Sequence, residues 1–161
     1  MRKLALIAGF VFGFFLVELL IFNLVGRLFI PNLLLLLIVS FSIFFGIRYG
    51  LFTAVLAGVL RDSFSTDHFG LHIFTFILCA FATILLKRYI YHRGSPFSFF
   101  LLTFLISLIN IVTQFVLGIM LGQIDFYQMI RFVLIPEVVS TIVIANFVFY
   151  QLRTCVLKLF V

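Results

Sequence analysis

Long apolar runs, separated by very few charges, most constrain what this chain can fold into. Hydrophobic residues make up 65% of its 161 positions, whereas Lys and Arg together number 11 and Asp and Glu only 5. A water-soluble domain of this length needs more polar side chains than that to cover its surface. A helix of about 17–25 mostly apolar residues, in contrast, can cross the hydrocarbon core of a bilayer. The composition therefore predicts an all-α integral membrane protein.

Six such runs, joined by short connections, predict a single domain over residues 1–161 that is a six-helix transmembrane bundle. The predicted spans are residues 4–22, 28–45, 50–60, 71–86, 97–121 and 132–150. The first run is too long for a signal peptide and lacks a cleavage site, so we expect it to be retained. The third run is short and needs a snorkelling Arg61 to cross. Residues 28–60 could instead form one long or broken element, which would give five crossings.

The positions of the basic residues favour six crossings with both termini in the cytoplasm. In that arrangement eight basic residues lie inside, namely Arg2, Lys3, Arg48, Lys87, Arg88, Arg93, Arg153 and Lys158. Three lie outside, namely Arg27, Arg61 and Arg131. This distribution obeys the positive-inside rule, and five crossings would violate it. The net charge of +6 is thereby explained by orientation and does not indicate nucleic acid binding. Basic and aromatic residues are mixed over 87–93, which suits contact with anionic membrane lipid.

Small and polar residues recur at helical spacing along three of the runs. Such stripes allow close helix–helix contact in a membrane. They are Ala5, Gly9 and Gly13; Gly46, Gly50, Ala54, Gly58 and Asp62; and Thr103, Ser107, Asn110, Gln114 and Gly118. Each stripe could pack against a neighbouring helix inside the bundle, line a polar cavity, or form a groove for a partner's helix. Residues 33–39 have no polar side, so we expect them to face lipid or a very apolar partner.

Ionisable residues gather at the predicted outer face of the bundle. Glu18 and Glu137 lie within spans, where a charge is costly and usually has a role. Other ionisable residues begin or end spans at the same face, namely Arg27, Arg61, Asp62, His72 and Arg131. Pairing of a glutamate with an arginine would lower the cost of burying both. This cluster is interpreted either as structural ion pairs or as a small polar site, open to the outside, for a ligand or partner.

Catalytic and metal-binding patterns are weak in this sequence. His68 and His72 have a usable ligand spacing, but Gly70 lies between them and no cysteine joins them. We therefore expect no metal and no cofactor. No phosphate-binding loop, nucleophile elbow or zinc-protease motif occurs, and short connections leave little room for an active site outside the membrane. Cys79 and Cys155 are interpreted as packing residues. The chain is not expected to be an enzyme.

One stretch of the sequence resembles the MreD family of rod shape-determining membrane proteins. Its features are a proline ahead of a leucine-rich run, spaced glycines, Gly-x-x-x-Asp and then Gly-Leu. They fall at Pro31-Asn32-Leu33-Leu34-Leu35, at Gly46, Gly50, Gly58 and Asp62, and at Gly70-Leu71-His72. Asn32 departs from the family, which often has Asp there. Length, basic N-terminus and scarcity of loops also agree.

The resemblance implies a non-enzymatic component of the bacterial cell-elongation complex in the inner (cytoplasmic) membrane. Such proteins bind the bitopic protein MreC and act with MreB, RodA and a transpeptidase to guide lateral peptidoglycan synthesis. Their fold looks like the substrate-binding membrane subunits of energy-coupling-factor transporters, so a vitamin-binding transporter subunit is the alternative function. The residues expected to serve a partner or an outward pocket are Glu18, Pro31, Gly46, Gly50, Ala54, Gly58, Arg61, Asp62, Gly70, His72, Asn110, Gln114 and Glu137.

Overall fold

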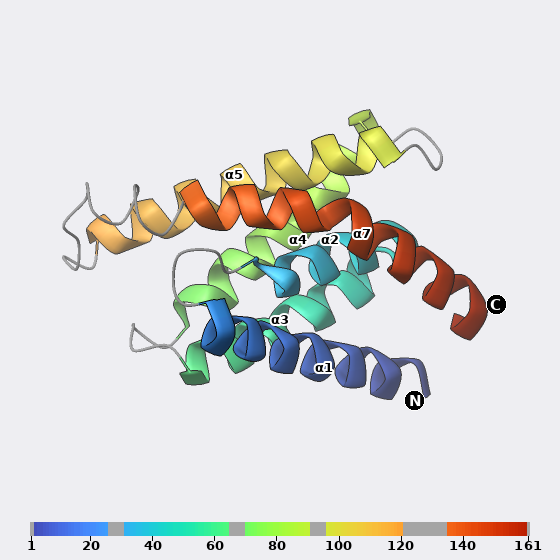
Figure 1. Ribbon diagram of the computed structural model, residues 1–161. Helices are drawn as coiled ribbons and strands as arrows, with labels where there is room; N and C mark the ends of the chain where they lie inside the picture. The colour runs from blue at the N-terminus through green and yellow to red at the C-terminus, as the bar shows by residue number, and fades with distance from the viewer. Residues whose placement is uncertain (1, 26–30, 65–69, 91–95, 121–134, 161) are drawn as a thin grey trace.

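The computed structural model describes residues 2–25, 31–64, 70–90, 96–120 and 135–160, and within these ranges the chain is helical without strands. The helices are α1 (Arg2–Val25), α2 (Leu33–Phe45), α3 (Ile47–Phe64), α4 (Leu71–Ile90), α5 (Pro96–Met120) and α7 (Ile135–Phe160). Figure 1 shows them as one bundle in which α1 and α7 lie in front of α2. The predicted all-α fold with six helices is confirmed for the described part of the chain.

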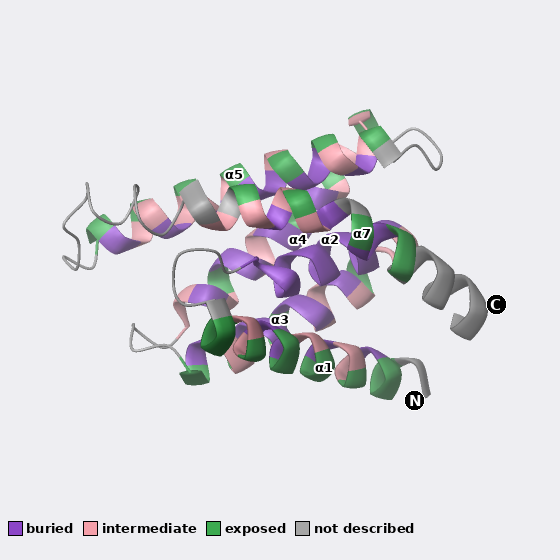
Figure 2. Cartoon of the chain, viewed as in Figure 1, coloured by how far each residue is buried: buried purple, intermediate pink, exposed green. Residues whose placement is uncertain are grey.

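Helix α2 is the centre of the bundle. Residues 33–43 are all buried, and α2 contacts α1, α3, α4, α5 and α7. Figure 2 shows it buried along its length, whereas α1 has one buried and one exposed side. The expectation that residues 33–39 face lipid or a partner is therefore wrong. A helix that is apolar on every side also suits the interior of a bundle, and the 13 residues of α2 span only about 20 Å.

Both ends of this buried helix have partners for their free backbone groups. At the start, the side chain of Asn32 accepts a hydrogen bond of 3.0 Å from the backbone N–H of Leu35. At the end, the ammonium group of Lys87 donates one of 2.5 Å to the carbonyl of Ile43. A buried helix end without such partners would be costly. The second span was predicted from residue 28, but the helix begins at Leu33; residues 26–30 lie outside the described part.

Glycines set the close contacts of α3 with its neighbours. Gly46 has a φ of +87°, a conformation that favours glycine, and there α2 ends and α3 begins. A methyl group added at Gly50 would collide with Ser42 of α2, and one added at Gly58 would lie 2.5 Å from the Cα of Ile73 in α4. Residues 33–64 therefore form two helices packed side by side, not one long element. Helix α3 is also longer than the predicted span 50–60.

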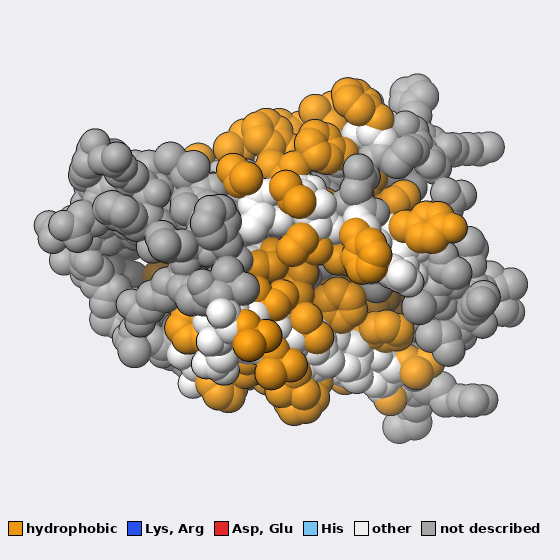
Figure 3. Space-filling view, viewed as in Figure 1, with side chains coloured by type: hydrophobic (Ala, Val, Ile, Leu, Met, Phe, Trp, Pro, Cys, Tyr) orange, Lys and Arg blue, Asp and Glu red, His pale blue; other side chains and the backbone are white. Residues whose placement is uncertain are grey.

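The outside of the bundle is largely apolar. Hydrophobic side chains dominate the described part of the face in Figure 3. Three described helical segments are long and apolar enough to cross a membrane, namely Leu4–Leu24, Leu71–Ile90 and Phe97–Met120. Leu33–Phe45 and Val139–Gln151 are shorter apolar segments. The number of crossings and the cytoplasmic location of both termini stay predictions.

Candidate functional site

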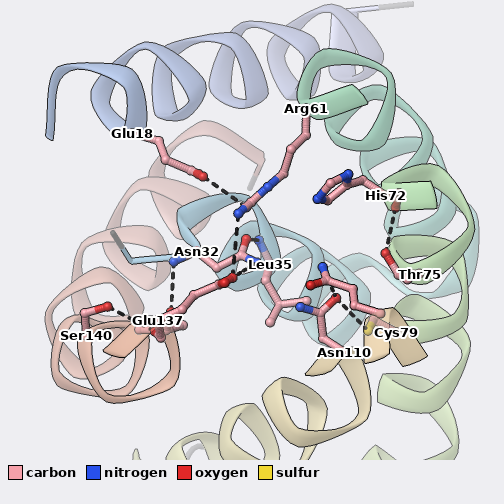
Figure 4. Close-up of polar contacts among 12 residues, drawn as sticks. Glu18, Asn32, Leu35, Arg61, His72, Thr75, Cys79, Asn110, Glu137 and Ser140 are labelled. Carbon is pink, nitrogen blue, oxygen red and sulfur yellow. Dashed lines mark hydrogen bonds and ion pairs between the residues drawn. The ribbon is translucent and has the colours of Figure 1, made fainter. Parts of the chain in front are cut away.

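Three largely buried charged side chains, Glu18, Arg61 and Glu137, are brought together by three helices at one end of the bundle. The Nη1 atom of Arg61 lies 3.0 Å from Oε1 of Glu18, and its Nη2 atom lies 3.6 Å from Oε1 of Glu137. The side chains of Glu18 and Glu137 are 10% and 14% exposed. Figure 4 shows Arg61 of α3 between the two glutamates of α1 and α7. The predicted pairing of these acids with an arginine is thus confirmed. The other two arginines predicted at this face, Arg27 and Arg131, lie outside the described residues.

Asn32 joins this cluster to the start of α2. Its side-chain amide donates a hydrogen bond of 2.7 Å to Oε1 of Glu137, and its backbone N–H donates one of 2.8 Å to the hydroxyl of Thr141. That hydroxyl in turn donates a hydrogen bond of 2.6 Å to the backbone carbonyl of Glu137. Asn32 and Thr141 are each 1% exposed. From the sequence, Asn32 is only a departure from a family pattern, and no role is predicted for Thr141. The signal for Asn32 was its place between a proline and a helical run, which is typical of a helix N-cap.

Electrostatics explain why two carboxylates can be buried beside one guanidinium. Both glutamates lie at the N-terminus of α2, where the helix dipole is positive. The contacts among these side chains therefore hold α1, α2, α3 and α7 together. The cluster consists of Glu18, Asn32, Arg61, Glu137 and Thr141. We refer to it as the polar cluster.

Asp62 and His72 form a second polar arrangement next to Arg61. The carboxylate of Asp62 accepts hydrogen bonds from the backbone N–H groups of Gly70, His72 and Ile73 at 2.9, 3.0 and 3.2 Å. Its Oδ1 atom also lies 2.9 Å from Nδ1 of His72. Asp62, at the end of α3, thus caps the first turn of α4, and Gly70 takes a φ of +103° just before it. The Gly-x-x-x-Asp…Gly-Leu pattern is explained by this junction of two helices.

The polar stripe of α5 faces the inside of the bundle. Thr103, Ser107, Asn110 and Gln114 are all buried, and the Gln114 amide donates a long hydrogen bond of 3.5 Å to Asn110. A small cavity of about 10 Å³ lies where this stripe meets the polar cluster. Its lining consists of Asn32, Leu35, Ser107, Asn110, Ile111, Glu137 and Thr141. This volume suits one water molecule, and the buried hydroxyl of Ser107 has no hydrogen-bond partner in the structure.

The candidate residues thus fall into distinct places. Glu18, Arg61 and Glu137 lie in the polar cluster, with Pro31 buried next to Asn32. Asp62, Gly70 and His72 form the α3–α4 junction. Asn110 borders the small cavity and bonds to Gln114. Gly46, Gly50, Ala54 and Gly58 belong to α3 and its start, and the last three are buried within the bundle.

Metal binding finds no support among the described residues. They contain no group of three or more His, Cys, Asp or Glu side chains that could hold a metal ion. His68, which was weighed as a ligand together with His72, lies outside the described part. Cys79 is buried, as expected for a packing residue, and its thiol points to Asn110 at 4.0 Å; the side chain of Cys155 is outside the described residues.

An apolar exterior around a buried and internally paired polar cluster defines the class as a helical membrane protein. The family model of the rod shape-determining protein MreD matches residues 1–159. The chain therefore belongs to the MreD family and is a rod shape-determining membrane protein. No curated protein and no solved structure matches it. The family resemblance is thereby confirmed, whereas the likeness to energy-coupling-factor transporter subunits stays a prediction.

Proposed function

We propose that this protein is a non-enzymatic scaffold of the bacterial cell-elongation complex in the cytoplasmic membrane. It binds an MreC-type bitopic protein and helps MreB, RodA and a transpeptidase to control lateral peptidoglycan synthesis. Membership of the MreD family carries this proposal. The geometry supports it because Arg61 pairs with Glu18 and Glu137, and Asp62 with His72, between the chain's own helices. What the bundle offers to a neighbour is then mostly apolar helix surface.

The proposed topology has six crossings and two cytoplasmic termini. The first turn of α1 and the last turn of α7 lie on the same side of the bundle in Figure 1, which agrees with an even number of crossings. Reporters that are active only in the cytoplasm, fused after residue 161 and inserted within 91–95, should both be active. The same reporter within 65–69 should be inactive. Activity at 65–69, or none at the C-terminus, contradicts this topology.

Recruitment of the partner is tested by co-purification. The tagged wild-type chain should retain MreC through detergent extraction and restore rod shape in cells depleted of their own MreD. Gly58→Leu should lose both, because the added side chain forces α3 away from α4. Gly13→Leu is the matched control for folding, since nothing lies within 4 Å of a Cβ at Gly13. A wild-type chain that folds but retains no MreC contradicts the scaffold proposal.

The alternative of a vitamin-binding transporter subunit needs a polar pocket of ligand size. The polar cavity beside Glu137 has room for about one water, which argues against a vitamin at that place. Calorimetry of the purified protein with vitamins, and mass spectrometry of small molecules retained through purification, separate the two functions. A vitamin bound with micromolar or better affinity favours the transporter subunit.

A further inference from the structure

The small cavity of about 10 Å³ between the polar stripe of α5 and the polar cluster is lined mostly by polar residues. Ser107 and Asn110 line it from α5, Glu137 and Thr141 from α7, and Asn32 from the start of α2. All of them except Glu137 are at most 3% exposed, so the cavity lies inside the bundle. Figure 4 shows Asn110 of α5 opposite Asn32 and Glu137. A polar lining of this kind suits bound water, whereas apolar cavities stay dry.

The hydroxyl of Ser107 needs a ligand at this cavity. It is buried and has no hydrogen-bond partner in the structure. A hydroxyl on a helix often donates to the carbonyl four residues earlier, as Thr113 does on the same helix and Thr83 does on α4. Ser107 does not, and a buried polar group without a partner costs free energy. A ligand inside the cavity that bonds to Ser107 removes this cost.

The α7 wall of the cavity offers further positions for hydrogen bonds. A carboxylate has about four acceptor positions, and the Asn32 amide fills one of them at Glu137. The Thr141 hydroxyl accepts one hydrogen bond and donates one, which leaves it a second lone pair. Water satisfies both walls because it accepts from Ser107 and donates to α7. A small cation would instead lie close to Arg61, whose guanidinium is 3.6 Å from the carboxylate of Glu137.

We propose that this cavity binds one long-lived water molecule, which accepts a hydrogen bond from Ser107 of α5 and donates to Glu137 and Thr141 of α7. Three partners are typical of a buried water. The water extends the polar cluster, which joins α1, α2, α3 and α7, to α5 as well. The site depends on the packing of α5 against α2 and α7 and not on the scaffold role, so the two proposals fail separately.

The test is water-selective NMR of the full chain in detergent micelles, with carbon-bound protons kept only at the methyl groups of leucine and isoleucine. Leu35 and Ile111 line the cavity, and Leu35 is 1% exposed, so bulk water does not reach it. In the wild type, the methyl groups of both residues should show NOE and ROE signals from water. These signals should be opposite in sign, which identifies a long-lived bound molecule.

Three variants locate the source of the signal. Ser107→Val fills the cavity with an added methyl group and should lose the signal. Ser107→Ala keeps the cavity and should retain the signal, which excludes the exchanging hydroxyl proton of Ser107 as its source. Thr103→Val is the matched control and should also retain it. The Thr103 hydroxyl is likewise buried without a partner, but Thr103 is not part of the lining.

Circular dichroism and gel filtration confirm that each variant is folded. The absence of a water signal at Leu35 in the wild type overturns the proposal, and this measurement needs no variant. So does a signal that persists in Ser107→Val, or one that is lost in Ser107→Ala or Thr103→Val. Greater thermal stability of the wild type in sodium than in potassium, with no such difference in Ser107→Val, assigns the cavity to an ion and also overturns the proposal.

Discussion

The ammonium group of Lys87 in α4 donates a hydrogen bond of 2.5 Å to the backbone carbonyl of Ile43 near the end of α2. The opposite end of α2 has Asn32 as its cap and the two glutamates of the polar cluster nearby. A helix is stabilised by charges that oppose its dipole, which are positive at its C-terminus and negative at its N-terminus. The charges that α2 itself lacks are therefore supplied by α1, α4 and α7, which allows a short helix to be fully buried.

Loss of the Lys87 ammonium should destabilise this arrangement. Lys87→Met keeps most of the apolar stem but leaves the carbonyl of Ile43 without this donor, which costs about 1–3 kcal/mol in the free energy of unfolding. Thermal unfolding in mild detergent measures the loss. Arg88→Met, which removes a neighbouring exposed charge, is the control and should change stability little. Equal effects of the two variants would show that the cap contributes nothing.

Arg61 should be the most sensitive residue of the polar cluster. Arg61→Met leaves Glu18 and Glu137 buried without their shared cation, and breaking a buried pair in this way costs about 3–5 kcal/mol. Denaturation in detergent should show a large loss, whereas Arg48→Met, at an exposed position of α3, should show little.

A second change identifies electrostatics as the cause. Combining Arg61→Met with Glu18→Gln removes one of the two negative charges, so it should recover part of the lost stability. If the double variant is no more stable than Arg61→Met alone, loss of the arginine's packing explains the effect instead.

Several features of this fold were accessible from the sequence for identifiable reasons. The helices were found because apolar runs are separated by charged or glycine-containing connections. The pairing of Glu18 or Glu137 with an arginine followed from topology, because the acids and three arginines were placed at the same face and an unpaired buried charge is costly; that the arginine is Arg61 came from the structure. These inferences need only position along the chain and the depth of a residue in a bilayer.

The position of α2 could not be obtained in the same way. In a membrane protein an apolar side chain suits contact with lipid and contact with protein equally well, so residues 33–39 carry no signal that separates the two. The bonds from Asn32 to Glu137 and Thr141 join residues more than 100 positions apart, and neither local propensity nor helical spacing encodes such a contact. Only the packing of α7 against α2 brings them together.

Asp62 should matter as the cap of α4. Asp62→Ala removes the acceptor for three backbone N–H groups and the partner of the His72 ring, so we expect a loss of about 2 kcal/mol or more. Ser63→Ala, at the exposed neighbouring position, is the control and should be nearly neutral. Hydrogen exchange of residues 70–74 should rise in Asp62→Ala, and unchanged protection there would contradict the capping role.

Two glycines allow the same substitution to be compared in opposite environments. At Gly58 a new methyl group would lie 2.5 Å from the Cα of Ile73, so Gly58→Ala must push α3 from α4 and should cost about 1–3 kcal/mol. At Gly13, where nothing lies within 4 Å of a Cβ, Gly13→Ala should stabilise the protein by up to about 1 kcal/mol, because alanine has the better helix propensity. Thermal unfolding of both variants under the same conditions gives the signs. A stabilising effect at Gly58 would mean that the α3–α4 contact is looser than the structure shows.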